Sequence, residues 1–524
     1  MLSSKKRIAQ ATFIVVLLNV MSKVLGFVRE QMIAVFYGAT ATTDAYLIAN
    51  RIPSMITGFL SGPLSIAFLP VFAAHIAKGD TEEAGRVASS IITISTLLVL
   101  VVSLAALVPA PAIVKAIAPG FSGTTLANAV MLTRVFFPAM VFPLLAAYAK
   151  SVLNTFGEFT VPAVAPVLQN LVIISVVAVF APVFGIAALA AGVIGGYVIG
   201  LLVQIPTWRK RGSWPSFSLH LEESTKRVFM LSLPLLASTL FSQVYMLVEG
   251  NLASRLPEGS IAALGFADRV RQVPVGLFVA AVTTVVYPSL SAMWARADKD
   301  SFKDTAVTGM RYVSFVCIPA AIGLMVLAEP VIRLAFGYGA FTPEAASKTA
   351  AALLAYAPGL VAISINQVTG IAFYSSHETR IPVALGIATS VLNAALAVLL
   401  VGPMAHVGLA IANSVATAAG ALVALYVLSR FLGNLPVKTL SVSLAKILGA
   451  SLAMGVSAFL LAGVTGFSSG AGGFVRNILS GAVTIGGAGT VYLALALALR
   501  CEEMTMFIGL AKDKLGSLSK KVRQ

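Results

Sequence analysis

Long apolar segments follow one another along almost the entire chain, separated by short polar or glycine-rich connections. A helix needs about 20 apolar residues to cross a ~30 Å hydrocarbon core, and the segments do not show the alternation typical of membrane β-barrel strands. The pattern predicts an all-α polytopic membrane protein with about fourteen transmembrane helices. The predicted spans are residues 9–37, 43–76, 86–116, 125–153, 161–182, 186–208, 225–254, 259–294, 304–336, 344–375, 381–402, 405–429, 440–465 and 474–499.

Composition supports a membrane location. Apolar residues make up 58% of the chain and charged residues only 11%, whereas a soluble domain has roughly a quarter charged. The two cysteines, Cys317 and Cys501, are far apart and suggest neither a disulfide framework nor a zinc site. We find no Walker A sequence and no nucleophile–base pair. The sequence therefore favours a non-enzymatic protein without a resident cofactor.

The connections between the spans alternate in charge. One set carries most of the Lys and Arg, and the other, with sequences such as GATATT and LPEGS, is almost free of them. The positive-inside rule then places both termini in the cytoplasm of a bacterial inner membrane. This asymmetry accounts for most of the net charge of +16, so nucleic acid is not an expected partner. The basic set comprises Lys78, Arg86, Arg209, Lys210, Arg211, Arg296, Lys299, Lys303, Arg380, Arg430 and Lys438.

An internal repeat divides the chain. Residues Pro138, Glu158 and Pro162 recur at one constant offset as Pro358, Glu378 and Pro382. Each repeat holds six spans, so the two halves have the same orientation, and transporters of that design bind substrate where their halves meet. We expect repeats at 1–215 and 216–432, two further helices at 433–500 and a basic cytoplasmic tail at 501–524.

Charged residues lie inside the predicted spans, where each costs about 2.5–3.5 kcal/mol and usually faces a cavity or a partner. Lys23 and Arg29 lie about 120° apart on a helix, with Gly26 between them. Five cations stand against three carboxylates, which predicts a net positive pocket for a phosphate or diphosphate. The alternative is that individual charges snorkel to the interface or pair structurally. The set is Lys23, Arg29, Glu30, Asp44, Arg51, Asp268, Arg269 and Arg271.

The local spacing of these charges separates their roles. Asp268 and Arg271 are three residues apart and can pair on one helix face, which leaves Arg269 pointing elsewhere. Pro274 should interrupt the regular helix nearby. Asp44 and Arg51, seven apart, share a stripe of the second span.

Other polar residues of the spans leave alternatives open. Arg134 would either line the same cavity or pair structurally, and Glu249 would bind a coupling cation or pair with a cavity arginine. Asn393 and Asn413 would coordinate a cation or form helix–helix hydrogen bonds, the commoner case. His377 and His406 fall near loops, so no metal site is expected. A coupling cation is therefore unassigned.

With these residues in view, the chain resembles the MurJ (MviN) family of lipid II flippases, within the multidrug/oligosaccharidyl-lipid/polysaccharide exporter superfamily. The matching sequences are SKVLGFVREQMIAVFYGATATTDAYLIANRIP near the N-terminus, and FADRVRQVPVGLF followed by YPSLS in the eighth span. The span plan extends the resemblance over essentially the whole chain.

The resemblance implies export of an undecaprenyl-diphosphate-linked peptidoglycan precursor, with Lys23, Arg29 and Arg269 binding the diphosphate and Asp44 as an essential acidic partner. It also implies that the last two spans form a groove for the lipid tail. Two positions depart from the family pattern: Thr57 replaces a frequent basic residue, and Asn393 replaces an acid of a suggested ion site.

The sequence thus predicts an alternating-access lipid II flippase, with Lys23, Arg29, Asp44, Arg51, Arg269 and Arg271 as substrate-binding residues. Cell-wall synthesis proteins are expected partners. Alternatives are a flippase for another polyprenyl-diphosphate saccharide, a cation-coupled multidrug exporter, and a membrane scaffold for cell-wall assembly. A basic cavity would repel the cationic substrates of many multidrug exporters, and a scaffold has no need of buried charges.

Overall fold

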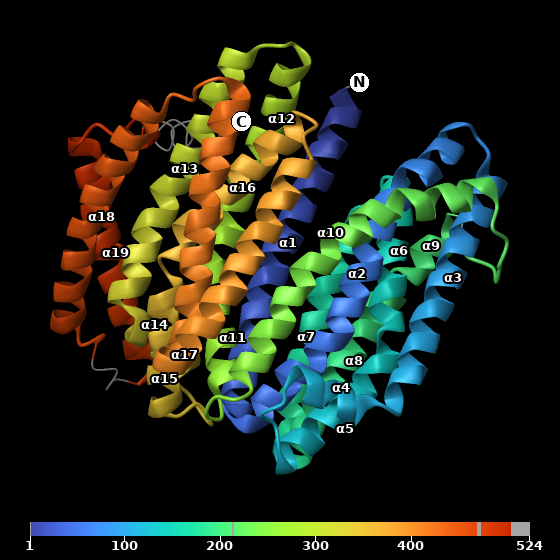
Figure 1. Cartoon of the computed structure of the whole chain (residues 1–524), viewed down its shortest axis with the longest axis horizontal. Helices are drawn as coiled ribbons and strands as arrows, with labels where there is room; N and C mark the ends of the chain where they lie inside the picture. Colours follow the sequence, from blue (N-terminus) through green and yellow to red (C-terminus); the bar gives the residue numbers. More distant parts are fainter. Residues whose placement is uncertain (1, 212–213, 469–472, 505–524) are drawn as a thin grey trace. The chain divides into compact units, whose positions relative to one another are not determined.

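The computed structural model describes residues 2–211, 214–468 and 473–504, which are helical almost throughout (Figure 1). The first repeat region contains α1 (Leu2–Tyr37), α2 (Ala41–Ala77), α3 (Thr81–Leu107), α4 (Ala110–Ile117), α5 (Gly123–Ala139), α6 (Val141–Thr155), α7 (Thr160–Phe184), α8 (Ile186–Leu202) and α9 (Ile205–Lys210). The remainder contains α10 (Glu223–Ala253), α11 (Ser260–Pro274), a π-helical turn (Val275–Val279), α12 (Ala280–Ala295), α13 (Lys299–Val326), α14 (Ala328–Phe336), α15 (Pro343–Tyr356), α16 (Gly359–Ser375), α17 (Arg380–Leu432), α18 (Val437–Thr465) and α19 (Phe474–Ala498).

Each predicted span has a helical counterpart. Ten helical stretches of the described residues are long and apolar enough to cross a membrane, and the bent pair α15–α16 makes an eleventh. The long α17 contains two spans, because Ala405 has a non-helical φ of 49° and ψ of −132°. The helices α1 and α10 coincide with the first and seventh predicted spans. The all-α polytopic fold class is confirmed.

Several spans predicted as continuous helices are broken. Residues 125–153 form α5 and α6, which separate at Met140, and residues 344–375 form α15 and α16, which are bent by 46°. A proline, Pro138 or Pro358, lies within two residues of each break and removes one backbone donor. As expected, the helix is irregular after Pro274, where the π-helical turn begins.

Backbone conformations recur at the offset of the predicted repeat. Gly185 has φ 53° and ψ −134°, and Ala405, its counterpart at that offset, has φ 49° and ψ −132°. Gly157 and His377, which are separated by the same offset, have φ values of 75° and 64°. Positive φ is uncommon for residues other than glycine, so its recurrence at Ala405 and His377 supports the repeat.

The chain packs into two compact units. The first comprises Met1–Ala262 and Tyr338–Thr342, and the second Ala263–Gly337 and Pro343–Gln524. The helix α10 belongs to the first unit, where it packs against α2. The boundary between the packed units, after Ala262, therefore differs from the predicted repeat boundary at 215. The repeat boundaries at 215 and 432 stay predictions.

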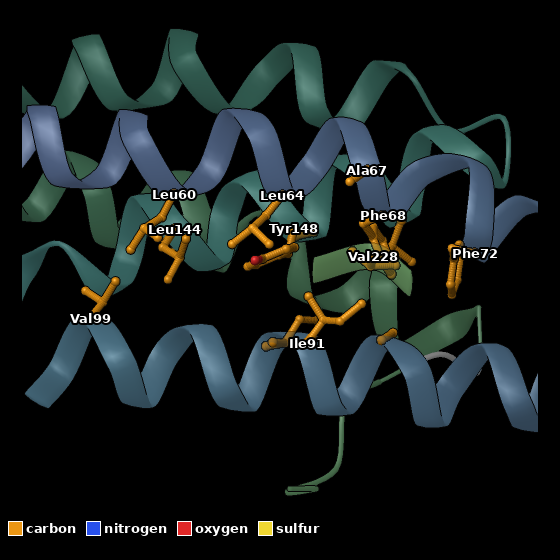
Figure 2. Packing of buried hydrophobic residues seen from close by; sticks show 14 of the residues in the cluster. Leu60, Leu64, Ala67, Phe68, Phe72, Ile91, Val99, Leu144, Tyr148 and Val228 are labelled. Carbon is orange, nitrogen blue, oxygen red and sulfur yellow. The ribbon is translucent and has the colours of Figure 1, made fainter. Parts of the chain in front are cut away.

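The core of the first unit joins α2, α3 and α6. Figure 2 shows Tyr148 of α6 among Leu64 and Phe68 of α2 and Ile91 of α3, all with at most 2% of their surface exposed. The Tyr148 hydroxyl donates to Ser95 Oγ at 2.9 Å. A buried hydroxyl needs such a partner because a polar group removed from water without a hydrogen bond is costly.

The last two helices attach to the second unit through α13. Both α18 and α19 lie beside each other at one edge of that unit (Figure 1), and α18 packs on α13. The rings of Phe315 in α13 and Tyr492 in α19 lie 5.2 Å apart, and the Tyr492 hydroxyl donates to the Phe315 carbonyl at 2.6 Å. These two helices are therefore built into the bundle.

Candidate functional site

Arg29 lies in α1, which packs against α7 within the first unit. Its Nη2 pairs with Glu30 Oε1 at 2.7 Å, and its Nη1 donates to Asn170 Oδ1 at 3.2 Å. Its Nε is buried and has no hydrogen-bond partner in the described part of the chain. Arginine has five N–H donors and no acceptor, so this side chain, 25% exposed, retains capacity for an anion.

Asn170 of α7 holds Arg29 in place and was not singled out in the sequence. Its Nδ2 donates to the carbonyls of Ser22 and Pro166, at 3.2 and 3.0 Å, which orients its Oδ1 toward the guanidinium. Near it, a Cβ added to Gly26 would have only Asn170 Nδ2 within 4 Å, at 3.9 Å. The sequence GEFTVPAVAPVLQN, which contains Glu158 and Pro162 of the predicted repeat, ends at this asparagine.

Asp44 in the first turn of α2 is buried and binds backbone. Its Oδ2 accepts the Gly259 N–H and its Oδ1 the Ala262 N–H, both at 2.7 Å. These donors stand at the start of α11, where N–H groups lack intrahelical acceptors. Gly259 has φ 80°, and an added Cβ would lie 2.1 Å from the Ala39 carbonyl oxygen. Asp44 therefore fixes the start of α11; its contact with substrate stays a prediction.

Arg51 of α2 and Glu249 of α10 form an ion pair within the first unit. Arg51 Nη2 lies 3.3 Å from Glu249 Oε2, and its Nη1 donates to the Met246 carbonyl at 2.8 Å. A Cβ on Gly250 would come within 3.0 Å of Arg51 Nη1, so glycine leaves room for the guanidinium. Of the two roles considered for Glu249, pairing with an arginine is the one observed.

In the second unit, each of the three guanidinium nitrogens of Arg271 donates to a neighbouring side chain. It pairs with Asp268, as its spacing predicted, and its Nη1 donates to Asn413 Oδ1 at 2.8 Å. Its guanidinium also lies 4.4 Å from the centroid of the Tyr356 ring, a favourable cation–π distance. The residue is 8% exposed. The expected helix–helix hydrogen bond of Asn413 is thus found, with Arg271 as its partner.

Two predicted cations are exposed. Lys23 lies in α1, six residues before Arg29, and Arg269 lies in α11, two residues before Arg271. Positions on a helix that are separated by two residues point in directions about 200° apart, so Arg269 is directed away from the Asp268–Arg271 pair. Because both side chains are exposed, both can reach a ligand.

The remaining candidates have structural surroundings. Arg134 donates from Nε to the Leu107 carbonyl at 3.1 Å, at the end of α3. His406 Nε2 lies 3.0 Å from the Lys348 carbonyl oxygen. Asn393 is buried, and its Oδ1 lacks a partner among the described residues. The same residues contain no group of three or more His, Cys, Asp or Glu able to hold a metal ion.

This arrangement can be compared with known proteins. The family model described as "Lipid II flippase MurJ" matches residues 33–487, most of the chain. The chain belongs to the MurJ family. The match includes Asp44, Arg51 and the whole of α11, with Arg269 and Arg271, while Lys23 and Arg29 precede it.

Relatives across the MurJ family cover most of the chain. A probable lipid II flippase MurJ of Vibrio cholerae is 32% identical over 423 residues, covering 78% of this chain and 80% of the relative. The lipid II flippase MurJ of Burkholderia cenocepacia is 30% identical, covering 76% and 79%. A probable lipid II flippase MurJ of Bdellovibrio bacteriovorus is 28% identical over 514 residues, covering 96% of both chains.

Solved structures agree with the MurJ assignment. A structure of lipid II flippase MurJ in an inward closed conformation matches with a TM-score of 0.78 and 25% identity, covering 93% of this chain and 99% of that one. An inward-facing multidrug resistance MATE transporter matches with a TM-score of 0.67 and 17% identity, covering 78% and 94%. The second likeness shows a shared fold only.

Proposed function

We propose that this protein is an alternating-access flippase that moves lipid II, the undecaprenyl-diphosphate-linked peptidoglycan precursor, from the cytoplasmic to the outer leaflet. Membership of the MurJ family over residues 33–487 carries this proposal. The intramembrane arginines give it a chemical basis, because a diphosphate is the part of a lipid-linked saccharide that planar, bidentate guanidinium groups bind best.

Arg29 and Arg269 are the proposed phosphate ligands, assisted by Lys23. Arg29 has an N–H without an acceptor in the described part of the chain, and Arg269 and Lys23 are exposed. Asp44, Arg51 and Arg271 bind backbone or oppositely charged groups. Their proposed contribution to substrate binding is to position the helices that carry the ligands.

Complementation tests the transport function. In a host depleted of its own lipid II flippase, this protein should sustain growth and keep lipid II accessible at the outer surface. The double variant Arg29→Ala, Arg269→Ala should lose both at matched expression. Arg86→Ala is the matched control, since Arg86 forms an exposed ion-pair cluster with Glu82 and Glu83. Full activity of the double variant would overturn the phosphate-ligand proposal.

A flippase for another polyprenyl-diphosphate saccharide is the nearest alternative. Its substrate shares the diphosphate and differs in the sugar, so the same arginines would serve it. Rescue of growth in the lipid II flippase-depleted host decides between the two. The alternative function as a multidrug exporter is supported only by the fold shared with the MATE transporter. We expect this protein to show no export of cationic dyes.

We further propose a bacterial inner-membrane location with both termini in the cytoplasm and an association with cell-wall synthesis proteins. The charge asymmetry of the connections supports this orientation. A cysteine at Glu258 should react with an impermeant thiol reagent in intact cells, and one at Ser216 should not. The native Cys317 and Cys501 are buried and give little background. Labelling at position 216 but not 258 would reverse the orientation.

A further inference from the structure

A second concentration of cations lies in the second unit and includes none of the candidate substrate-binding residues. There, α13, the first turns of α18 and the segment following α19 surround a cavity of about 290 Å³. Arg311, Lys438, Lys446 and Arg500 line it, together with Glu502 and Glu503. Four cations thus face two carboxylates, and the family resemblance assigns no role to any of these residues.

Both carboxylates are already engaged by one of the cations. Arg311 lies 2.6 Å from Glu503 Oε1 through Nε and 2.8 Å from Glu502 Oε2 through Nη2. Ser443 Oγ donates to the same Glu503 oxygen at 2.5 Å. Burial acts to raise the pKa of Glu503, but the hydrogen bonds from Ser443 and Arg311 outweigh it and lower that pKa below its ordinary value. Glu503 is therefore ionised and committed to Arg311.

The other three cations have no such partner. Within residues 2–211, 214–468 and 473–504, no acid pairs with Lys438, Lys446 or Arg500. The sequence after Met504 contains one acid, Asp513, and five Lys or Arg, so its own net charge is also positive. A cavity with this surplus favours an anion.

The adjoining face of α18 is suited to an acyl chain. Val442, which lines the cavity, is 50% exposed, and Leu452 and Val456 are 56% and 63% exposed. These positions lie on one side of the helix, since they are ten and fourteen residues from Val442. Gly449 lies between them, and a Cβ there would have no atom within 4 Å. An open apolar track therefore leads away from the basic cavity.

We propose that this cavity binds the phosphate of an anionic phospholipid, with Lys438, Lys446 and Arg500 around the headgroup and the acyl chains along α18. Lysine and arginine at the membrane surface bind anionic headgroups in this manner. The bound lipid would stabilise the packing of the start of α18 and of the segment after α19 against α13, beside the Arg311–Glu503 pair. This site is separate from the proposed phosphate ligands of transport, Arg29 and Arg269.

The experiment uses the purified full-length protein, without lipid II, and measures binding of phosphatidylglycerol by native mass spectrometry. Phosphatidylcholine is the neutral lipid for comparison, and inorganic phosphate tests a soluble source of the same chemistry. The wild-type protein should prefer phosphatidylglycerol. The double variant Lys446→Gln, Arg500→Gln should bind it about 25-fold more weakly, at about fivefold per cation removed. Arg311 is left intact so that its ion pairs keep the segment folded.

The matched control removes the same charge elsewhere. Arg296, which directly follows α12, and Lys299, the first residue of α13, are exposed cations, and the variant Arg296→Gln, Lys299→Gln should bind like wild type. Equal losses in both double variants, or no preference for phosphatidylglycerol in the wild type, would overturn the proposal. Binding of inorganic phosphate in place of phosphatidylglycerol would overturn the lipid as its source. Transport activity does not enter these readouts.

Discussion

Arg29 in the first unit and Arg271 in the second have the same kinds of hydrogen-bond partners but differ in how many of their nitrogens are engaged and in how exposed they are. Each is near a carboxylate on its own helix, Glu30 or Asp268, and each donates to an asparagine of another helix. Arg271 adds the Tyr356 ring and is 8% exposed. Arg29 keeps a buried Nε without an acceptor in the described chain, and its side chain is 25% exposed.

The difference shows that an intramembrane arginine is not by itself a binding residue. A guanidinium whose three nitrogens all donate to the protein, as in Arg271, stabilises helix packing, and removing it takes donors away from Asp268 and Asn413. A guanidinium with a donor left over can bind a phosphate without first breaking an ion pair. We therefore expect variants of Arg29 to impair transport and variants of Arg271 to impair stability.

The largest expected effect is that of Arg29→Ala on transport. Loss of hydrogen bonds to a charged group, worth about 1.5–3 kcal/mol, should lower flipping roughly ten- to a hundredfold. The measurement is surface-accessible lipid II in depleted cells at equal protein abundance. The comparison breaks down if Arg271→Ala lowers flipping as much per folded molecule.

A smaller effect is expected for Arg271→Ala on stability. The variant removes the Arg271 donors from Asn413 and from Asp268, which keeps its hydrogen bond from Gln272. Because Asp268 is also partly exposed, the expected cost is about 2 kcal/mol, below that of a fully buried pair. Thermal unfolding of the purified protein should show a lower midpoint than that of the wild type. An unchanged midpoint would contradict the stabilising role assigned to Arg271.

The smallest effect separates the two asparagines. Asn170→Ala removes the acceptor that orients Arg29, and one such hydrogen bond, worth about 1 kcal/mol, corresponds to about fivefold lower flipping. Asn413→Ala removes the equivalent bond of Arg271 and should leave flipping per folded molecule unchanged. Equal transport in both variants would show that orientation of Arg29 by Asn170 is unimportant.

The Asp44 contact illustrates how far a sequence can be interpreted. Its position in the second span marked it as an unusual intramembrane charge, but its partners, the N–H groups of Gly259 and Ala262, lie six predicted spans further along the chain. Backbone donors at a helix start carry no signature in residue type. Long-range contacts of this kind are therefore absent from the pattern that revealed the residue.

By itself, the sequence determined the helical class, the position of each span and the set of intramembrane charges, and it predicted a parallel repeat from the constant offset between matching residues. These properties depend on local hydropathy and on recurring residue types, because a span is defined by the bilayer it crosses. The Asp268–Arg271 pair was predictable for a similar reason, since one helix turn brings them together.

Only the tertiary structure decided which of those charges retain binding capacity. In the tertiary structure Asn170 accepts a hydrogen bond from Arg29, and Glu249 forms an ion pair with Arg51. The helix α10 packs in the first unit, although its position in the sequence lies in the predicted second repeat. The tertiary structure also brings Glu503, which follows the last helix, to Arg311 of α13. Such pairings depend on which helix faces meet, and helix packing in a membrane is chosen by close fit and hydrogen bonds between distant segments, which no local pattern records.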